Sequence, residues 1–308
     1  MARLDQLRAI VEHLIARNYR NEIDAALPFP EQVVALASAF RTRLCNLVAA
    51  WIRVGYCQGN FNSDNCAAGG FTLDYGPFGF CELFDPRFQP WTGGGVHFSF
   101  FNQPAAAEAN FKMFWAALRP LLETNQNSLC QLDQIREGFA EVMEQTLDEM
   151  WARKLGLNTA DPALVQELLQ LLVASKADYT LLFRRLTTLP TQAKDLHDCF
   201  YLPSDSALNA RWEAWLQRWS QRLNDEGNPT AAATTMQQHN PAITWREWLI
   251  APAYEQAALG NTTLIQELQT LFSQPYSEPS ANLASQYSRR RPRELFHAGG
   301  ISHYSCSS

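Results

Sequence analysis

Apolar side chains recur every three or four positions over most of this chain, and this spacing limits the fold more than any other feature. In the first segment they are Leu4, Leu7, Ile10, Val11, Leu14 and Ile15. Such spacing predicts an amphipathic helix. Further helices are predicted after Pro30 to about Val54 and over residues 105–123, 128–155, 162–186, 207–224, 229–239, 242–259 and 262–272. The expected fold is therefore mainly α, a helical bundle.

The remaining segments are predicted to be non-helical. Residues 66–73 are short, contain glycine and are partly β-branched, which favours a small β-hairpin, the only β structure expected. Residues 75–104 are rich in glycine, proline and aromatic residues. They show neither the helical nor the strand period of apolar residues, which predicts a long ordered loop. Beyond Ser273 the composition shifts to serine, proline, arginine and glycine. We therefore expect one helical domain over residues 1–272 and an extended tail over 273–308.

Composition argues against several classes of partner. The chain has 308 residues, 46% of them hydrophobic, which is enough for a sizeable core. Its net charge of −6 argues against nucleic acid or an anionic membrane as the main partner, because such contacts need clustered lysine and arginine. The basic run at residues 289–293 is interpreted as a solvated tail. We recognise no signal peptide and no run of membrane-spanning length, so a cytoplasmic protein is expected.

Two polar motifs carry the candidate chemistry: residues 62–65 (NSDN) and residues 74–76 (DYG). A carboxylate beside a carboxamide, followed by a second carboxylate, supplies the hard oxygen ligands of a magnesium–nucleotide site. In this interpretation Asp64 is the general base, while Asn65 and Asp74 hold Mg²⁺, or Mn²⁺ as the alternative, and Asp74 thereby binds the nucleotide. Protein kinases divide the same tasks among a catalytic-loop Asp, a nearby Asn and the Asp of an Asp-Phe-Gly triplet. Taken alone, residues 62–65 could equally be a polar turn whose side chains bond their own backbone.

The same segments resemble a known family. Residues 54–65 (VGYCQGNFNSDN) and 70–80 (GFTLDYGPFGF) look like the signature of the SelO (selenoprotein O) pseudokinases, and the resemblance covers essentially the whole chain. It implies a fold similar to the C-lobe of a protein kinase, and transfer of AMP from ATP to Ser, Thr or Tyr hydroxyls of proteins. It also implies a redox-active thiol at Cys306, with Cys66 and Cys81 as candidate partners. The alternative for Cys306 is a frayed end without a role.

The chain departs from the family pattern in its nucleotide-binding elements. It has no glycine-rich loop followed by a strand lysine, and residues 93–95 (GGG) follow the catalytic segment and are interpreted as a flexible loop. The family usually has His-Gly where this chain has Gln58-Gly59. We therefore expect the chain to lack the nucleotide-binding lobe and to bind ATP weakly by itself.

Three interpretations follow. The chain could be the catalytic half of an adenylyltransferase that a separate chain carrying the nucleotide-binding lobe completes. It could instead be a catalytically inert remnant that binds a partner through an exposed apolar face. A truncated reading frame is the third interpretation.

Overall fold

The structure is a computed structural model that describes residues 2–76, 78–91 and 95–296. Within these residues the fold is mainly α with one small two-stranded sheet, as predicted. The chain divides into two compact units. The first unit comprises Met1–Ala50, Asn60–Tyr75 and Asn102–Leu147, and the second comprises Trp51–Gly59, Gly76–Phe101 and Asp148–Ser308. The chain therefore passes between the units several times. Residues 60–75, which carry Asp64, Asn65 and Asp74, belong to the first unit, and Gly76 belongs to the second.

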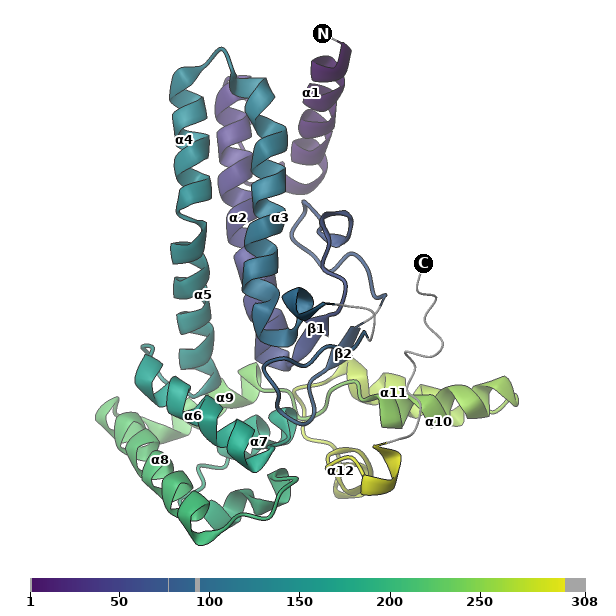
Figure 1. The fold of residues 1–308 in the computed structure, drawn as a ribbon. Helices are drawn as coiled ribbons and strands as arrows, with labels where there is room; N and C mark the ends of the chain where they lie inside the picture. The colour runs from purple at the N-terminus through teal and green to yellow at the C-terminus, as the bar shows by residue number, and fades with distance from the viewer. Residues whose placement is uncertain (1, 77, 92–94, 297–308) are drawn as a thin grey trace. The chain divides into compact units, whose positions relative to one another are not determined.

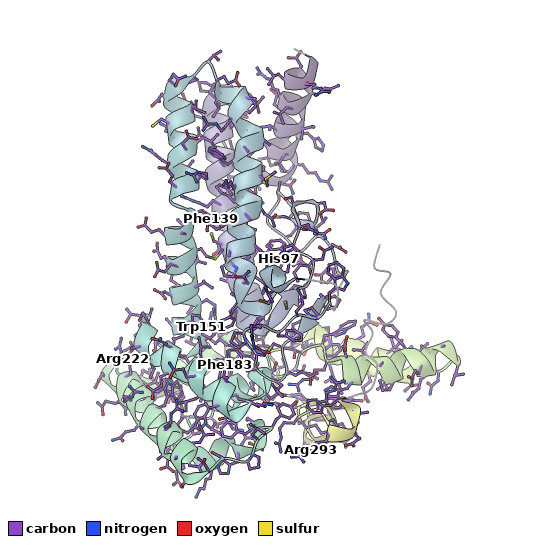
Figure 2. All side chains as sticks on the ribbon, in the orientation of Figure 1. His97, Phe139, Trp151, Phe183, Arg222 and Arg293 are labelled. Atoms are coloured by element: carbon purple, nitrogen blue, oxygen red, sulfur yellow. The ribbon has the colours of Figure 1, made fainter. Side chains whose placement is uncertain are left out.

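The first unit is built on long helices. Helix α1 (Ala2–Leu14) continues as a π-helix to Tyr19 and is followed by α2 (Phe29–Val54). Helices α3 (Gln103–Leu118) and α4 (Gln126–Glu137) run alongside α2 (Figure 1). Aromatic side chains join them, because the Phe111 ring lies 6.0 Å from that of Phe40 and 5.2 Å from that of Phe139, which is labelled in Figure 2. These rings form the core between the helices.

Helix α2 also satisfies the length and composition test for a membrane span. Its 26 residues include a window with a mean hydropathy of 1.4, and it is the one helix of the described residues to do so. The sequence analysis recognised no such run. Buried core helices share these properties, and α2 carries several fully buried side chains: Val33, Leu36, Ala37, Phe40, Leu44 and Val48.

The predicted helix over residues 128–155 is broken in the structure. Helix α4 ends before Gly138, and α5 (Phe139–Lys154) begins directly after it. Arg41 on α2 donates from Nη1 to the carbonyl oxygen of Ile135 at 3.0 Å. This bond satisfies one of the carbonyl groups that a helix end leaves unpaired. The apolar period continues across the break, which is why the sequence predicted a single helix.

The second unit contains a core of tryptophans on α8 (Ser206–Asp225), which packs against α6 (Pro162–Ser175). Trp212, Trp215 and Trp219 recur at helical spacing and are at most 1% exposed, so they form a core-facing stripe. Each indole N–H has an acceptor: Ser175 Oγ and the carbonyl oxygens of Leu164 and Leu155, all at 2.8 or 2.9 Å. The stripe therefore buries large apolar surface without leaving a donor unpaired.

A second predicted helix, over residues 162–186, is also divided. Helix α6 ends at Lys176, which has a left-handed backbone with φ of 44°, and α7 (Tyr179–Leu186) follows after Ala177 and Asp178. Asp178 caps α7 by accepting a hydrogen bond from the Leu181 N–H at 3.0 Å. Helix α9 (Pro229–His239) lies where the sequence predicted it.

The end of the described chain differs from the extended tail that was expected. After α10 (Glu247–Ala258) and α11 (Thr263–Ser273), residues Ala281–Tyr287 form helix α12, and a short 3-10 turn follows at Arg293–Leu295. Tyr287 is buried in one apolar cluster with α10 and α11, and Leu283 packs against it. The expectation was wrong up to residue 296, because Leu283 and Tyr287, four positions apart, are enough to anchor a short helix.

The sheet pairs β1 (Tyr56–Gln58) with β2 (Phe78–Phe80) in antiparallel register, with Cys57 opposite Gly79. The sequence predicted one small hairpin but placed it at residues 66–73 and did not locate these two strands. Both strands have only three residues, which is too short for a period to show, and β2 lies in the stretch interpreted as a loop. The predicted hairpin within residues 66–73 is present as an isolated antiparallel bridge between Cys66 and Thr72.

Buried charges hold distant parts of the second unit together. Arg246 and Asp178 are 2% and 0% exposed and form two hydrogen bonds of 2.8 Å. Glu82 accepts from Arg246 at 3.2 Å and from the Trp248 indole at 2.8 Å. Burial raises the pKa of the Glu82 carboxyl, although Arg246 opposes this change. Arg246 and Asp178 thus form a bidentate pair that is almost fully buried. Bidentate geometry is the one in which an arginine–carboxylate pair is strongest.

We predict that Asp178→Asn lowers the free energy of unfolding by about 3–5 kcal/mol, because it removes the bidentate carboxylate partner of the buried Arg246 and leaves only the longer contact with Glu82. The matched control is Asp198→Asn. Asp198 pairs with Arg185 at the surface, where the side chains are 60% and 40% exposed, so its loss should cost less than about 1 kcal/mol. Urea denaturation of both variants measures the difference. Equal losses would contradict this account of the buried pair.

Candidate functional site

The three predicted site residues lie on one short segment of the first unit, Asn60–Tyr75. Asp64 and Asn65 belong to a 3-10 turn, Ser63–Asn65, which leads into the bridge between Cys66 and Thr72. Asp64 precedes this bridge by two residues on one arm, and Asp74 follows it by two on the other. Antiparallel arms bring residues at equal distance from a bridge to the same end of a hairpin. Asp64 and Asp74 therefore flank the bridge at equal separations in sequence, and we call residues 64–74 the site hairpin.

The three side chains differ in exposure. Asp64 is exposed, while Asn65 and Asp74 are half-buried. The Asn65 Nδ2 donates to the carbonyl oxygen of Asn60 at 2.8 Å. This bond uses the donor end of the carboxamide, so Oδ1 is the atom of Asn65 suited to a cation.

Asn110 of α3 holds the chain just before Asp64. Its side chain is 8% exposed, its Nδ2 donates to the Phe61 carbonyl oxygen at 2.9 Å, and its Oδ1 accepts from the Ser63 hydroxyl at 3.2 Å. Sequence reasoning did not find this residue. A polar side chain inside a predicted helix gives no sign that its partners lie 47 and 49 residues away.

The oxygen donors of the three candidate side chains suit a hard cation whose coordination a substrate would complete. No group of three or more His, Cys, Asp or Glu side chains able to hold a metal ion occurs in the described residues. Asp64, Asn65 and Asp74 offer two carboxylates and one carboxamide instead. Mg²⁺ is usually held by one or two carboxylates together with phosphate and water oxygens, so this set fits a magnesium–nucleotide site better than an all-protein cage.

The second unit contains the other part of the predicted motif. Phe78 and Phe80 are packing residues there, since both rings lie 5.6 Å from the ring of Tyr56. The Tyr56 hydroxyl donates to Gln58 Oε1 at 2.6 Å, and Gln58 is buried. Gln58 thus occupies the family's usual histidine position as a buried hydrogen-bond acceptor.

Asn240, which follows α9, has a structural role. Asn240 is fully buried, accepts from Lys154 Nζ at 2.9 Å and donates to the Lys154 carbonyl oxygen at 2.9 Å. The Lys154 ammonium also lies 3.7 Å from the centroid of the Phe183 ring (labelled in Figure 2), and burial lowers its pKa well below the usual range. Asn240 therefore serves to pair a buried lysine.

Comparison with known proteins identifies the family. The family model described as "Protein adenylyltransferase SelO" matches residues 1–273. The chain is 35% identical over 272 residues to "Protein nucleotidyltransferase YdiU" of Tolumonas auensis, covering 85% of this chain and 51% of that protein. Its namesake in Aromatoleum aromaticum is 32% identical over 279 residues, with shares of 86% and 52%. That of Xanthomonas oryzae pv. oryzae is 31% identical over 316 residues, with shares of 98% and 58%.

The class defined by these findings is that of proteins related to protein nucleotidyltransferases. The chain belongs to the SelO family, as the sequence motifs implied. It spans about half the length of the curated relatives it matches.

The cysteines named as redox partners are poorly disposed to react. Burial raises the pKa of the Cys66 thiol to about 12 and that of the Cys81 thiol further still. Only the thiolate is a strong nucleophile, so both groups are unreactive at neutral pH. Cys306 itself lies outside the described residues.

We predict that iodoacetamide at pH 7 modifies the exposed Cys130 much faster than Cys66. Below its pKa, the thiolate fraction of Cys66 rises about tenfold per pH unit, so its labelling should accelerate steadily from pH 7 to 9. Peptide mass spectrometry of the native protein resolves each site, and a urea-unfolded sample is the control. Labelling of Cys66 as fast as that of Cys130 at pH 7 would refute the prediction.

Proposed function

We propose that this chain is the catalytic-loop portion of a SelO-type protein adenylyltransferase, which transfers AMP from ATP to Ser, Thr or Tyr hydroxyls of proteins. One observation carries the proposal. Asp64, Asn65 and Asp74 flank the bridge of a single short hairpin, and family membership makes this the segment in which such chemistry is expected. The proposed setting is the cytoplasm.

The exposed carboxylate of Asp64 is the general base in this proposal. The acceptor hydroxyl oxygen bonds to the α-phosphorus of ATP, the bond from that phosphorus to the oxygen bridging to the β-phosphorus breaks, and pyrophosphate leaves. The hydroxyl proton passes to Asp64. Exposure keeps Asp64 accessible to a protein substrate.

Asn65 and Asp74 are the proposed ligands of Mg²⁺, or of Mn²⁺. Such an ion, when bound, neutralises phosphate charge and orients the leaving group. Asn65 is oriented for this by its bond to Asn60, and half-burial of Asp74 limits the freedom of its carboxylate. Phosphoryl-type transfer depends mainly on such positioning and charge stabilisation.

We further propose that a separate polypeptide supplies the nucleotide-binding lobe. The relatives are almost twice the length over which this chain matches them. The sequence contains neither a glycine-rich loop followed by lysine nor another recognisable phosphate cradle. The test can use the part of the Tolumonas auensis relative that this chain does not match, expressed as a separate chain and called the complementing half below.

We expect this chain and the complementing half together, but neither alone, to label protein with ³²P from α-labelled ATP and Mg²⁺. Asp74→Ala should abolish both labelling and ATP binding measured by isothermal titration. Asp64→Asn should preserve ATP binding but lower labelling by roughly 10²-fold or more, the usual contribution of a general base. Labelling that survives both substitutions would contradict the assigned roles.

A second candidate function is partner binding without catalysis, and an exposed apolar strip favours it. Phe71, Leu73 and Tyr75 are 49%, 50% and 65% exposed, while the intervening Thr72 and Asp74 are half-buried. This alternation presents three large apolar side chains on one side of an extended segment. Adjacent exposed apolar groups of this kind mark interaction surfaces.

We predict that Leu73→Asp weakens association with the complementing half at least about tenfold, since it places a charge where apolar surface would be buried. Leu202→Asp is the matched control, because Leu202 is 42% exposed and belongs to the second unit. Surface plasmon resonance compares the variants. Tight association without any AMP transfer would favour the partner-binding function, whereas equal affinities of both variants would exclude the strip as the contact.

A further inference from the structure

The turn of the site hairpin is attached to the helices of the first unit by one arginine. Arg43 of α2 donates from Nη1 to the Gly69 carbonyl oxygen at 2.9 Å and from Nη2 to the Asn18 carbonyl oxygen at 2.8 Å. It also forms an ion pair with Glu22. One guanidinium thereby joins the hairpin turn to the segment that follows α1.

Tyr19 completes this attachment. The guanidinium carbon of Arg43 lies 4.0 Å from the centroid of the Tyr19 ring, and the Tyr19 hydroxyl donates to the Ala68 carbonyl oxygen at 2.6 Å. Tyr19 is fully buried, and this burial raises its pKa to about 12, so its hydroxyl remains a donor throughout the neutral range. Two consecutive carbonyl groups of the turn are therefore held by two stacked side chains.

The contact is close enough to require glycine in the turn. Gly70 has φ of +73°, and a Cβ added there would lie 2.5 Å from the Cβ of Arg43. A Cβ on Gly69 would lie 2.9 Å from the side-chain Nδ2 of Asn18. The hairpin backbone thus rests directly on the Arg43 side chain, which no residue other than glycine would allow without a shift.

The site hairpin needs such an attachment because its own pairing is minimal. Its arms share one isolated bridge, Cys66 with Thr72. A two-stranded hairpin is at best marginally stable in water even when it is longer. The spacing between Asn65 on one arm and Asp74 on the other must therefore be maintained from outside the hairpin.

We propose that Arg43 is a positioning residue of the candidate site: it holds the turn that joins the two arms and so maintains the spacing of the metal-ligand side chains. This inference rests on the proposed function only in so far as those side chains bind a cation. Arg43 itself is bonded to the turn and not to Asp64, Asn65 or Asp74. Its planar fork reaches two carbonyl groups at once, which a lysine ammonium on a single stem reproduces poorly.

The test compares Arg43→Gln with Arg119→Gln. Arg119 is a matched control in the same unit, since it also pairs with a carboxylate, Asp133, and lies 4.9 Å from an aromatic ring centroid, that of Trp115. These partners of Arg119 lie on α3 and α4 and not on the site hairpin. Two readouts are needed: amide hydrogen exchange of residues 64–74 by mass spectrometry, and Mn²⁺ binding by electron paramagnetic resonance with the metal alone as probe.

We expect Arg43→Gln to accelerate exchange in residues 64–74 by about tenfold or more, because the charge-assisted hydrogen bond to the Gly69 carbonyl and the anchoring bond to Asn18 are lost. Mn²⁺ affinity should fall about 10–100-fold, as it does when residues that orient metal ligands are removed. Arg119→Gln should change neither quantity. Arg43→Lys should give intermediate exchange, because it retains the charge but not the fork.

The positioning role is overturned if Arg43→Gln leaves exchange of residues 64–74 unchanged, or accelerates it no more than it accelerates α2 and α3 as a whole. The exchange comparison decides this independently of metal. If the unsubstituted chain binds no Mn²⁺, the metal site of the proposed function fails, while faster exchange confined to the hairpin still establishes Arg43 as the residue that holds it.

Discussion

The non-helical segments of this protein cannot pair all of their backbone N–H and C=O groups among themselves. This constraint determines which polar side chains the helices must supply. The site hairpin has one bridge between its arms, so the carbonyl groups of its turn take donors from Tyr19 and Arg43, and the Phe61 carbonyl just before the hairpin takes one from Asn110. A buried backbone group without a hydrogen-bond partner lowers the stability of the fold. The side chains that supply these partners are therefore required at their particular positions in the helices. The helices therefore act as a frame whose polar side chains shape the segment that carries the candidate chemistry.

Buried and exposed charges have different roles in this molecule. Arg246, Asp178 and Lys154 are almost fully buried, and every one of them is hydrogen-bonded within the second unit. Such groups stabilise one arrangement of the chain, because breaking a buried pair leaves an uncompensated charge. Asp64, by contrast, is exposed. The strongest electrostatic interactions in the structure are thus structural, and the candidate base stands apart from them.

Family membership and length together define the biochemical question. The SelO family model matches residues 1–273, yet the chain spans about half the length of its curated relatives. The candidate base and metal ligands lie on the part that is present. The apolar strip at Phe71, Leu73 and Tyr75 and the Arg43 attachment belong to the same hairpin, so the proposed complementing half can be tested against both.

The sequence by itself determined the helical class, the tryptophan core face and the positions of Asp64, Asn65 and Asp74, because side-chain period and local motifs are properties of neighbouring residues. It missed the breaks at Gly138 and Lys176, because the apolar helical period continues across both of them. It also missed the strands β1 and β2 and helix α12, because these short elements lie in segments whose local pattern does not distinguish them. Only the tertiary structure showed that Arg43, Tyr19 and Asn110 hold the site hairpin. Their partners lie 25 to 49 residues away along the chain, and such pairings arise from how helices pack rather than from any spacing that can be read in sequence.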